Sequence, residues 1–160
     1  MIANGFNSVG SAVGARRYHR DPQHVDNPWV VDPIEDVRCF AWDIDDNNNI
    51  VGMVRTNSTT ERAVVWDEQS VRHTLRTAGN YNVNHGRFFD GHGGVIGEIA
   101  RSTNLDYGIA FWSDWSSTPT VVSVGDKMLN LKDRNSSGTI IGVRRRVNAD
   151  VLSEYGWVWD

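Results

Sequence analysis

An internal repeat is the feature that most constrains the fold of this chain. A triplet of two apolar residues and a glycine recurs four times, at intervals of about 40 to 45 residues. A second motif follows each triplet, as "PWVVD", "AVVWD", "IAFWS" and "GWVWD". The repeat glycines are Gly14, Gly52, Gly97 and Gly142, and the aligned column of the second motif holds Val31, Trp66, Trp112 and Trp159.

Each repeat has the composition of short strands joined by turns. Runs of β-branched and aromatic residues alternate with clusters of Gly, Asn, Asp and Ser, and no window keeps a helical period. An apolar residue followed by a polar turn precedes each glycine, at Phe6-Asn7, Ile44-Asp45, Phe89-Asp90 and Leu131-Lys132. Four antiparallel strands in about 40 to 45 residues are typical of a propeller blade. The sequence therefore predicts a single all-β domain over 1–160, a four-repeat β-propeller with repeats at about 1–37, 38–80, 81–126 and 127–160.

The end of the sequence predicts an incomplete last blade. The chain stops at Trp159-Asp160, where the third strand of the fourth repeat ends, so the outer strand of that blade is expected to be missing. Residues 1–5 are too short to supply it. Unpaired strand edges are templates for further pairing. We therefore expect either a four-bladed ring or self-association, for instance two chains forming one eight-bladed ring.

Composition excludes several classes of partner. The 20 acidic residues outnumber the 16 Lys and Arg, for a net charge of −4, so nothing favours nucleic-acid binding. No apolar run reaches the roughly 18 to 20 residues of a membrane span, and membrane insertion is not expected. The N-terminal stretch does not read as a Sec signal peptide. Cys39, the single cysteine, has no partner for an internal disulfide and is expected to be a small buried residue.

The run "DDNNN" before Ile50 has two interpretations. Its repeat column also holds "DGHGG" and "DRNSSG", whose shared property is turn propensity, so a tight turn is favoured. The alternative is calcium, because Asp43, Asp45, Asn47 and Asn49 alternate like the first ligands of a calcium loop. Against calcium, Val54 stands where an acid would close such a loop, and Asn48 replaces its glycine. No other cofactor is expected.

An apolar-polar pair, a short turn, "IVG" and then "AVVW" or "IAFW" together resemble the HAF-type extracellular repeat family. The similarity extends over nearly the whole chain, and Ile44-Asp45-Asp46 comes nearest to that family's turn motif. The resemblance implies a β-propeller with binding roles at surfaces or outside the cell. It offers no catalytic residues to transfer.

Trp115 is the first candidate for a binding residue. It lies in the polar stretch "SDWSSTP", outside the repeat columns, where an indole could stack on a sugar or a partner surface or fold back onto its own blade. By contrast, Trp66, Trp112 and Trp159 share a column and are expected to pack between blades. Further tentative ligand-binding residues are Tyr18, Tyr107, Tyr155, Arg55, Arg101 and Arg144.

The three candidate arginines belong to a recurring pattern. Each repeat has an Arg after its second strand and an acid before its third, and these pairs are expected to face each other across a hairpin: Arg17 with Asp26, Arg55 with Glu61, Arg101 with Asp106 and Arg144 with Glu154. The intervening loops, predicted at 18–25, 56–60 and 147–153, vary in length. The alternative is a polar rim repeated by symmetry, suited to a multivalent ligand.

Known catalytic signatures are missing from the sequence. It contains no HExxH, CxxC, nucleophile elbow or P-loop, although carboxylates on different blades could converge for glycoside hydrolysis. The expected function is a non-catalytic interaction module that binds glycan or protein at a cell or particle surface, as an oligomer. One alternative is a structural subunit of a virion, tail or filament that contacts neighbours through open strand edges. A saccharide hydrolase is another, and a cytoplasmic location stays open.

Overall fold

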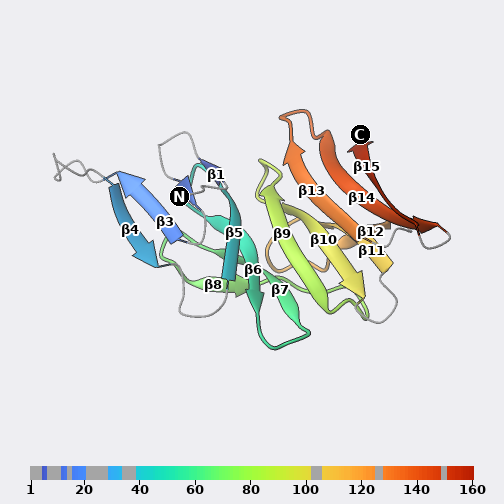
Figure 1. The fold of residues 1–160 in the computed structure, drawn as a ribbon. Coiled ribbons are helices and arrows are strands. Elements are labelled where there is room, and N and C mark those ends of the chain that lie inside the picture. Colours follow the sequence, from blue (N-terminus) through green and yellow to red (C-terminus); the bar gives the residue numbers. More distant parts are fainter. Residues whose placement is uncertain are drawn as a thin grey trace.

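The structure is a computed structural model that describes residues 5–6, 12–13, 16–20, 29–33, 39–101, 106–124, 128–148 and 151–160, with side chains over 39–101, 107–124, 129–144 and 154–160. These residues form strands and turns and contain no helix (Figure 1). The predicted all-β class is therefore confirmed. Accordingly, no helix in this part of the chain could serve as a membrane span.

The strands fall into four groups that follow the four repeats. The first group is β1 (Gly5–Phe6), β2 (Ala12–Val13), β3 (Arg16–Arg20) and β4 (Trp29–Pro33). The second is β5 (Cys39–Ile44), β6 (Ile50–Arg55), β7 (Glu61–Trp66) and β8 (Arg72–Thr74). The third is β9 (Val83–Phe89), β10 (Val95–Arg101), β11 (Asp106–Trp112) and β12 (Thr120–Ser123). The fourth is β13 (Met128–Arg134), β14 (Ile140–Asn148) and β15 (Val151–Trp159).

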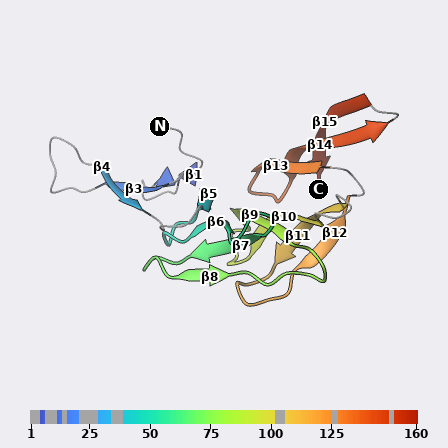
Figure 2. The same cartoon turned by 60° about the horizontal axis from the view of Figure 1, so that its bottom comes forward.

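Each group is an antiparallel meander, in which every strand pairs with its neighbour in sequence. A single parallel bridge between Glu61 and Val83 joins the second and third meanders into one eight-stranded sheet. The meanders follow one another along an arc, with β4 near one end and β15 near the other (Figures 1 and 2). The described strands close into no barrel or ring, so the structure supports the all-β fold and leaves the propeller as a proposal.

Each repeat glycine from the second to the fourth repeat lies opposite a β-bulge. Gly52, Gly97 and Gly142 pair with the first strand of their own meander, and the pairing register shifts beside each of them. A Cβ on Gly142 would lie 2.7 Å from the carbonyl oxygen of Asn130, and on the other two glycines it would come still closer to the equivalent carbonyl. The glycine is therefore required by the close approach of the neighbouring backbone.

The polar run after Ile44 forms a hairpin turn. The Asp45 carboxylate accepts hydrogen bonds from the backbone amides of Asn47 (3.0 Å) and Asn49 (2.8 Å), and Asn48 has a positive φ of 63°. The next hairpin repeats this pattern: the Asp90 carboxylate accepts from the amide of Gly94, and Gly93 has a φ of 95°. A turn ending in one left-handed residue is a common hairpin connection. The predicted turn is confirmed.

One predicted alignment is wrong. In the fourth repeat the hairpin begins at Asn135, whose side chain accepts from the amide of Thr139, so Arg134-Asn135 is the equivalent of Ile44-Asp45. Leu131-Lys132, which the sequence pattern selected, lies inside β13 at the bulge. The fourth repeat has Arg134 where the other repeats have an apolar residue, and the pattern therefore selected an earlier apolar-polar pair.

Two of the three predicted loops are also corrected. Tyr18 lies in β3, and residues 21–25 are outside the described residues. Strands β14 and β15 run to Asn148 and from Val151, so most of 147–153 is hairpin strand. The 56–60 loop is confirmed, because β6 ends at Arg55 and β7 begins at Glu61.

The predicted Arg-acid pairs are correct in two repeats. Arg55 lies opposite Glu61 and forms an ion pair with it, and Arg101 lies opposite Asp106 in the register. In the fourth repeat Arg144 lies opposite Tyr155, while Glu154 lies opposite Arg145. In the first repeat Arg17 lies opposite Asp32, and Asp26 is outside the described residues. Both corrections come from strands that extend further than the sequence indicated.

Two of the three tryptophans of the column, Trp112 and Trp159, pack between repeats, as predicted. Trp112 of the third repeat is 1% exposed and belongs to a cluster that includes Val51, Val65 and Leu75 of the second repeat. Trp159 of the fourth repeat packs against a cluster containing Ile96 and Ile109 of the third. Trp66 is buried among residues of its own meander. The core is thus a series of layers between successive meanders.

Candidate functional site

An open hollow of about 630 Å³ lies where the second and third meanders meet. It is lined by the outer strand of the second meander and by two loops of the third. The lining residues are His73, Thr74, Arg76, Gly93, Asp114, Trp115 and Ser116. An aromatic surface bordered by hydroxyl, carboxylate and cationic groups is a common composition for a small-molecule binding site.

The loop after β11 holds Trp115 in place. The Asp114 carboxylate accepts hydrogen bonds from the amide (2.7 Å) and hydroxyl (2.6 Å) of Ser116, and these bonds lower the pKa of Asp114. The Trp115 ring is partly buried against the core cluster of Trp112, and its centroid is 5.1 Å from that of His73. Trp115 therefore both packs on its own meander and lines the hollow, so the two interpretations of this residue are compatible.

The opposite wall of the hollow is fixed by the second meander. His73 lies on β8, where its Nε2 is 2.9 Å from Oδ2 of Asp67, and this hydrogen bond is the main cause that lowers the pKa of Asp67. The indole N–H of Trp112 donates to the carbonyl of Arg76 at 2.8 Å. The buried Trp112 thereby anchors the segment that carries Arg76. Both walls of the hollow are held by contacts that do not involve a ligand.

A second pocket, of about 330 Å³, lies between the second, third and fourth meanders. Its polar centre is a chain of charged side chains on β6, β7, β9 and β10. Nε2 of His85 is 2.6 Å from Glu61, and Nδ1 of His85 is 3.4 Å from Glu98. Arg87 donates to Glu98 at 3.0 Å, and Nε of Arg55 donates to Glu61 at 2.8 Å. We refer to Arg55, Glu61, His85, Glu98 and Arg87 as the charged network.

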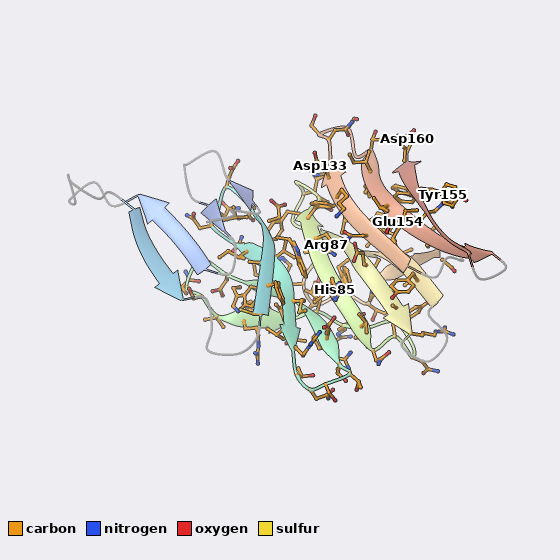
Figure 3. All side chains as sticks on the ribbon, viewed as in Figure 1. His85, Arg87, Asp133, Glu154, Tyr155 and Asp160 are labelled. Carbon is orange, nitrogen blue, oxygen red and sulfur yellow. The ribbon has the colours of Figure 1, made fainter. Side chains whose placement is uncertain are left out.

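The charged network is largely buried. The side chains of Glu61, His85 and Glu98 are only 12%, 19% and 6% exposed. Glu98 also accepts a hydrogen bond from the backbone amide of Leu131 in β13, so it ties the third meander to the fourth. Figure 3 shows His85 and Arg87 on β9, in the middle of the arc.

Mutual contacts determine the ionisation of this network. The hydrogen bond with His85, followed by that with Arg55, lowers the pKa of Glu61 to about 2 against the opposing effect of burial. Burial alone would lower the pKa of His85, but its bonds to the two glutamates outweigh burial and raise it. Burial would raise the pKa of Glu98, and the contacts with His85 and Arg87 lower it instead. The two carboxylates thus favour the protonated form of the imidazole that lies between them.

Aromatic rings border the charged network. The guanidinium carbon of Arg87 lies 4.1 Å from the centroid of the Trp42 ring, and that ring is 5.4 Å from His85. Tyr107 lines the second pocket, where burial and then the charges of Glu98 and Glu61 raise the pKa of its hydroxyl. The proximity of these groups indicates a rigid, closely packed charge cluster.

The candidate binding residues do not converge on one site. Trp115 lines the hollow, Tyr107 lines the second pocket, and Arg55 is bound to Glu61. Arg101 lies over the ring of Tyr81 at 4.7 Å. Tyr155 is exposed on β15, opposite Arg144, at the far end of the arc (Figure 3). The side chain of Tyr18 is outside the described residues.

Two of the four candidate calcium ligands, Asp43 and Asp45, accept hydrogen bonds from backbone amides. The Asp43 carboxylate accepts from Phe89 (3.0 Å) and Ile44 (2.9 Å); burial raises its pKa although these bonds oppose the shift. Asp45 binds the amides of Asn47 and Asn49 within its own hairpin. Among the described residues, no three His, Cys, Asp or Glu side chains cluster in a way that would hold a metal ion. Calcium binding stays an untested prediction.

Several residues of both sites escaped the sequence analysis. His73, Thr74 and Arg76 come from a different repeat than Trp115, and sequence patterns cannot bring them together. Glu98 carried a usable signal, because an acid within the apolar strand "VIGEIAR" must be buried and therefore needs partners. His85 and Arg87 lie on the adjacent strand and supply them.

No family model, curated protein or solved structure matches this chain.

Proposed function

We propose that this chain is a non-catalytic interaction module of the β-propeller type that binds a glycan in the hollow beside Trp115. The observation that carries the proposal is the position of Trp115, partly exposed above a hollow whose other walls present His73, Thr74, Arg76 and Asp114. An indole offers an apolar face to the C–H groups of a sugar ring, and the polar side chains are suited to its hydroxyl groups.

The propeller arrangement is supported by the way in which the meanders repeat. The same columns of residues meet at successive junctions, and the Trp of one meander packs against the meander before it. Four-stranded antiparallel meanders stacked in this way are the building unit of propellers. The resemblance to HAF-type repeats agrees with this arrangement and with a location outside the cell or on a particle surface.

The charged network favours binding over hydrolysis. A glycosidase of the common type needs one carboxylic acid whose pKa is raised, so that it can protonate the leaving group. Glu61 and Glu98 both have a lowered pKa, and both accept hydrogen bonds from cationic partners. They are suited to hold meanders together rather than to donate a proton.

The test is a glycan array followed by calorimetric titration of the best ligand. Trp115→Ala should weaken binding roughly thirtyfold, which corresponds to a loss of about 2 kcal/mol. Arg76→Ala should also weaken binding, and it serves as a second variant because Trp115 contributes to packing. Tyr155→Ala, an exposed aromatic far from the hollow, is the matched control and should bind like the wild type.

Far-UV circular dichroism checks that each variant is folded. The proposal is wrong if the array shows no bound glycan, or if folded Trp115→Ala and Arg76→Ala variants retain wild-type affinity.

A further inference from the structure

The second, third and fourth meanders carry an equivalent pair of apolar residues, and in the second and third this pair contacts the next meander. The pair is Val51 and Val65 in the second meander, Ile96 and Phe111 in the third, and Ile141 and Val158 in the fourth. In all three meanders the two residues lie directly opposite each other on the second and third strands, so their side chains share one face of the sheet. We refer to this pair and its face as the docking face of a meander.

The docking faces of the second and third meanders are covered. Val51 and Val65 are both 0% exposed and share a cluster with Trp112 of the following meander. Ile96 is 6% exposed, and the ring of Phe111 is 5.1 Å from that of Trp159 in the following meander. In both cases the cover is the tryptophan-bearing face of the next repeat.

The docking face of the fourth meander is uncovered. Ile141 is 45% exposed and Val158 is 63% exposed, although they occupy the positions that are buried in the two preceding meanders. Two apolar side chains opposite each other, on a face that elsewhere receives a neighbouring sheet, form a surface that a partner would bury. Tyr155 and Asp160 mark this end of the arc in Figure 3.

The first meander is the natural partner for this face. The second and third meanders each receive the tryptophan-column side of the meander that follows, so the matching partner for this face is the tryptophan-column side of another meander of the same kind. The first and fourth meanders lie at opposite ends of the arc (Figures 1 and 2). One chain therefore has its exposed docking face at one end of the arc and its first meander at the other.

We propose that the docking face of the fourth meander binds the first meander of a second copy of this chain. In a ring of two copies the fourth meander of each chain contacts the first meander of the other, so the dimer has two-fold symmetry and is closed. Eight meanders lie within the range of known propellers. This inference rests on the propeller-type arrangement proposed above and is independent of glycan binding.

Sedimentation velocity and light scattering over a range of protein concentrations test the proposal. The wild-type chain should reach twice the 18.0 kDa mass of one chain. Val158→Asp should remain folded by circular dichroism and weaken dimerisation by at least about a hundredfold, because it places a charge in an apolar contact. Ile141→Glu should likewise remain folded and weaken dimerisation. Val71→Asp is the matched control, because Val71 is 54% exposed in the turn before β8 and should leave the dimer intact.

A wild-type chain that stays monomeric at every concentration would overturn the proposal, and so would a dimer that is indifferent to Val158→Asp and Ile141→Glu. The variant Asp160→Cys in a Cys39→Ala background distinguishes the head-to-tail contact from a contact between the fourth meanders of two chains. Tail-to-tail contact would bring the two introduced thiols together and give a disulfide-linked dimer on oxidation, contradicting the head-to-tail arrangement. The head-to-tail ring keeps them apart, so a non-covalent dimer without that disulfide is expected.

Discussion

The junction between the second and third meanders differs in chemistry from that between the third and fourth, although both use the same strand positions. At the first junction, Val51, Val65 and Trp112 are all buried, and the contact between Glu61 and His85 crosses the same junction. At the second, Trp157 and Trp159 are only partly buried, and the buried carboxylate of Glu98 binds the backbone of β13. The repeat thus determines which positions meet at a junction, and the side chains at those positions determine how much the junction contributes to stability.

The two kinds of junction are expected to contribute differently to stability and to specificity. Burial of apolar side chains contributes roughly 25 cal/mol for each Å² removed from water. A buried ion pair gains little net stability, because the cost of desolvating the charges offsets their attraction, but losing one partner is costly. The junction between the second and third meanders, where Trp112 is fully buried, should therefore carry more of the free energy of unfolding than the junction between the third and fourth, where Trp159 is only partly buried.

Removal of the indoles gives the largest expected contrast between the junctions. Trp112→Ala should destabilise the chain by about 3 to 5 kcal/mol, the usual cost of truncating a buried aromatic residue. It also removes the hydrogen bond to Arg76. Trp159→Ala should cost clearly less, because Trp159 is only partly buried. Urea unfolding at one fixed protein concentration measures the free energy of unfolding of both variants. Equal losses of stability would refute the proposed difference between the two junctions.

Alanine at the repeat glycines gives the next largest effect. Gly97→Ala should destabilise by about 1 to 3 kcal/mol, because the new Cβ would overlap the carbonyl oxygen of His85 and force the bulge to move. Gly142→Ala should cost less, since its Cβ would start 2.7 Å from the equivalent carbonyl of Asn130.

Thermal unfolding compares the stability of the Gly97→Ala and Gly142→Ala variants. Gly156→Ala is the control, because a Cβ there meets nothing within 4 Å. If Gly142→Ala were the more damaging of the two variants, the steric account of the repeat glycine would fail.

The smallest expected effect is a pH dependence confined to the charged network. The pKa of His85 is raised in the folded state, so its contribution to stability is present below the ordinary histidine pKa and is lost as pH rises through the folded value. The pKa of Glu61 is lowered to about 2, so its contribution is present above pH 4.5 and is lost as pH falls toward 2. Stability from the network should therefore be greatest between about pH 4.5 and 6.5.

Urea unfolding of the wild type and of His85→Gln, compared at pH 6 and pH 9, tests this expectation. The wild type should lose stability at the higher pH, and His85→Gln should lose much less. His92→Gln replaces an exposed histidine in the hairpin before β10 and should retain the wild-type dependence. A His85→Gln chain with the full wild-type pH dependence would show that the imidazolium is not the titrating group.

Much of the fold could be predicted because repeats and turns are local signals. The glycine column, the Trp column and the Asp or Asn that begins each hairpin are visible in the sequence, and all three correspond to structural equivalents from the second repeat onward. The bulge was not visible, since it changes the pairing without changing the residue types. Leu131-Lys132 was misassigned for another reason: Arg134, which stands at the same distance from its glycine as Ile44 and Phe89, is not apolar.

The candidate site could be predicted only in part. Trp115 was identified because it lies outside the repeat columns, and it does line a hollow. Its companions His73 and Arg76 belong to the preceding repeat, and their approach depends on how two meanders pack. The same limit applies to Glu61 and His85, which lie far apart in sequence and meet at 2.6 Å.

The hairpin of the third repeat is held from both sides, and this affects how the molecule comes apart. The amide of Phe89 donates to Asp43 of the second repeat, while Arg134 of the fourth donates to the carbonyls of Phe89 and Asp90. Opening this hairpin would break bonds to both neighbours at once. The three later repeats are therefore coupled through a single short segment, and they should lose their structure as one cooperative unit instead of fraying one repeat at a time.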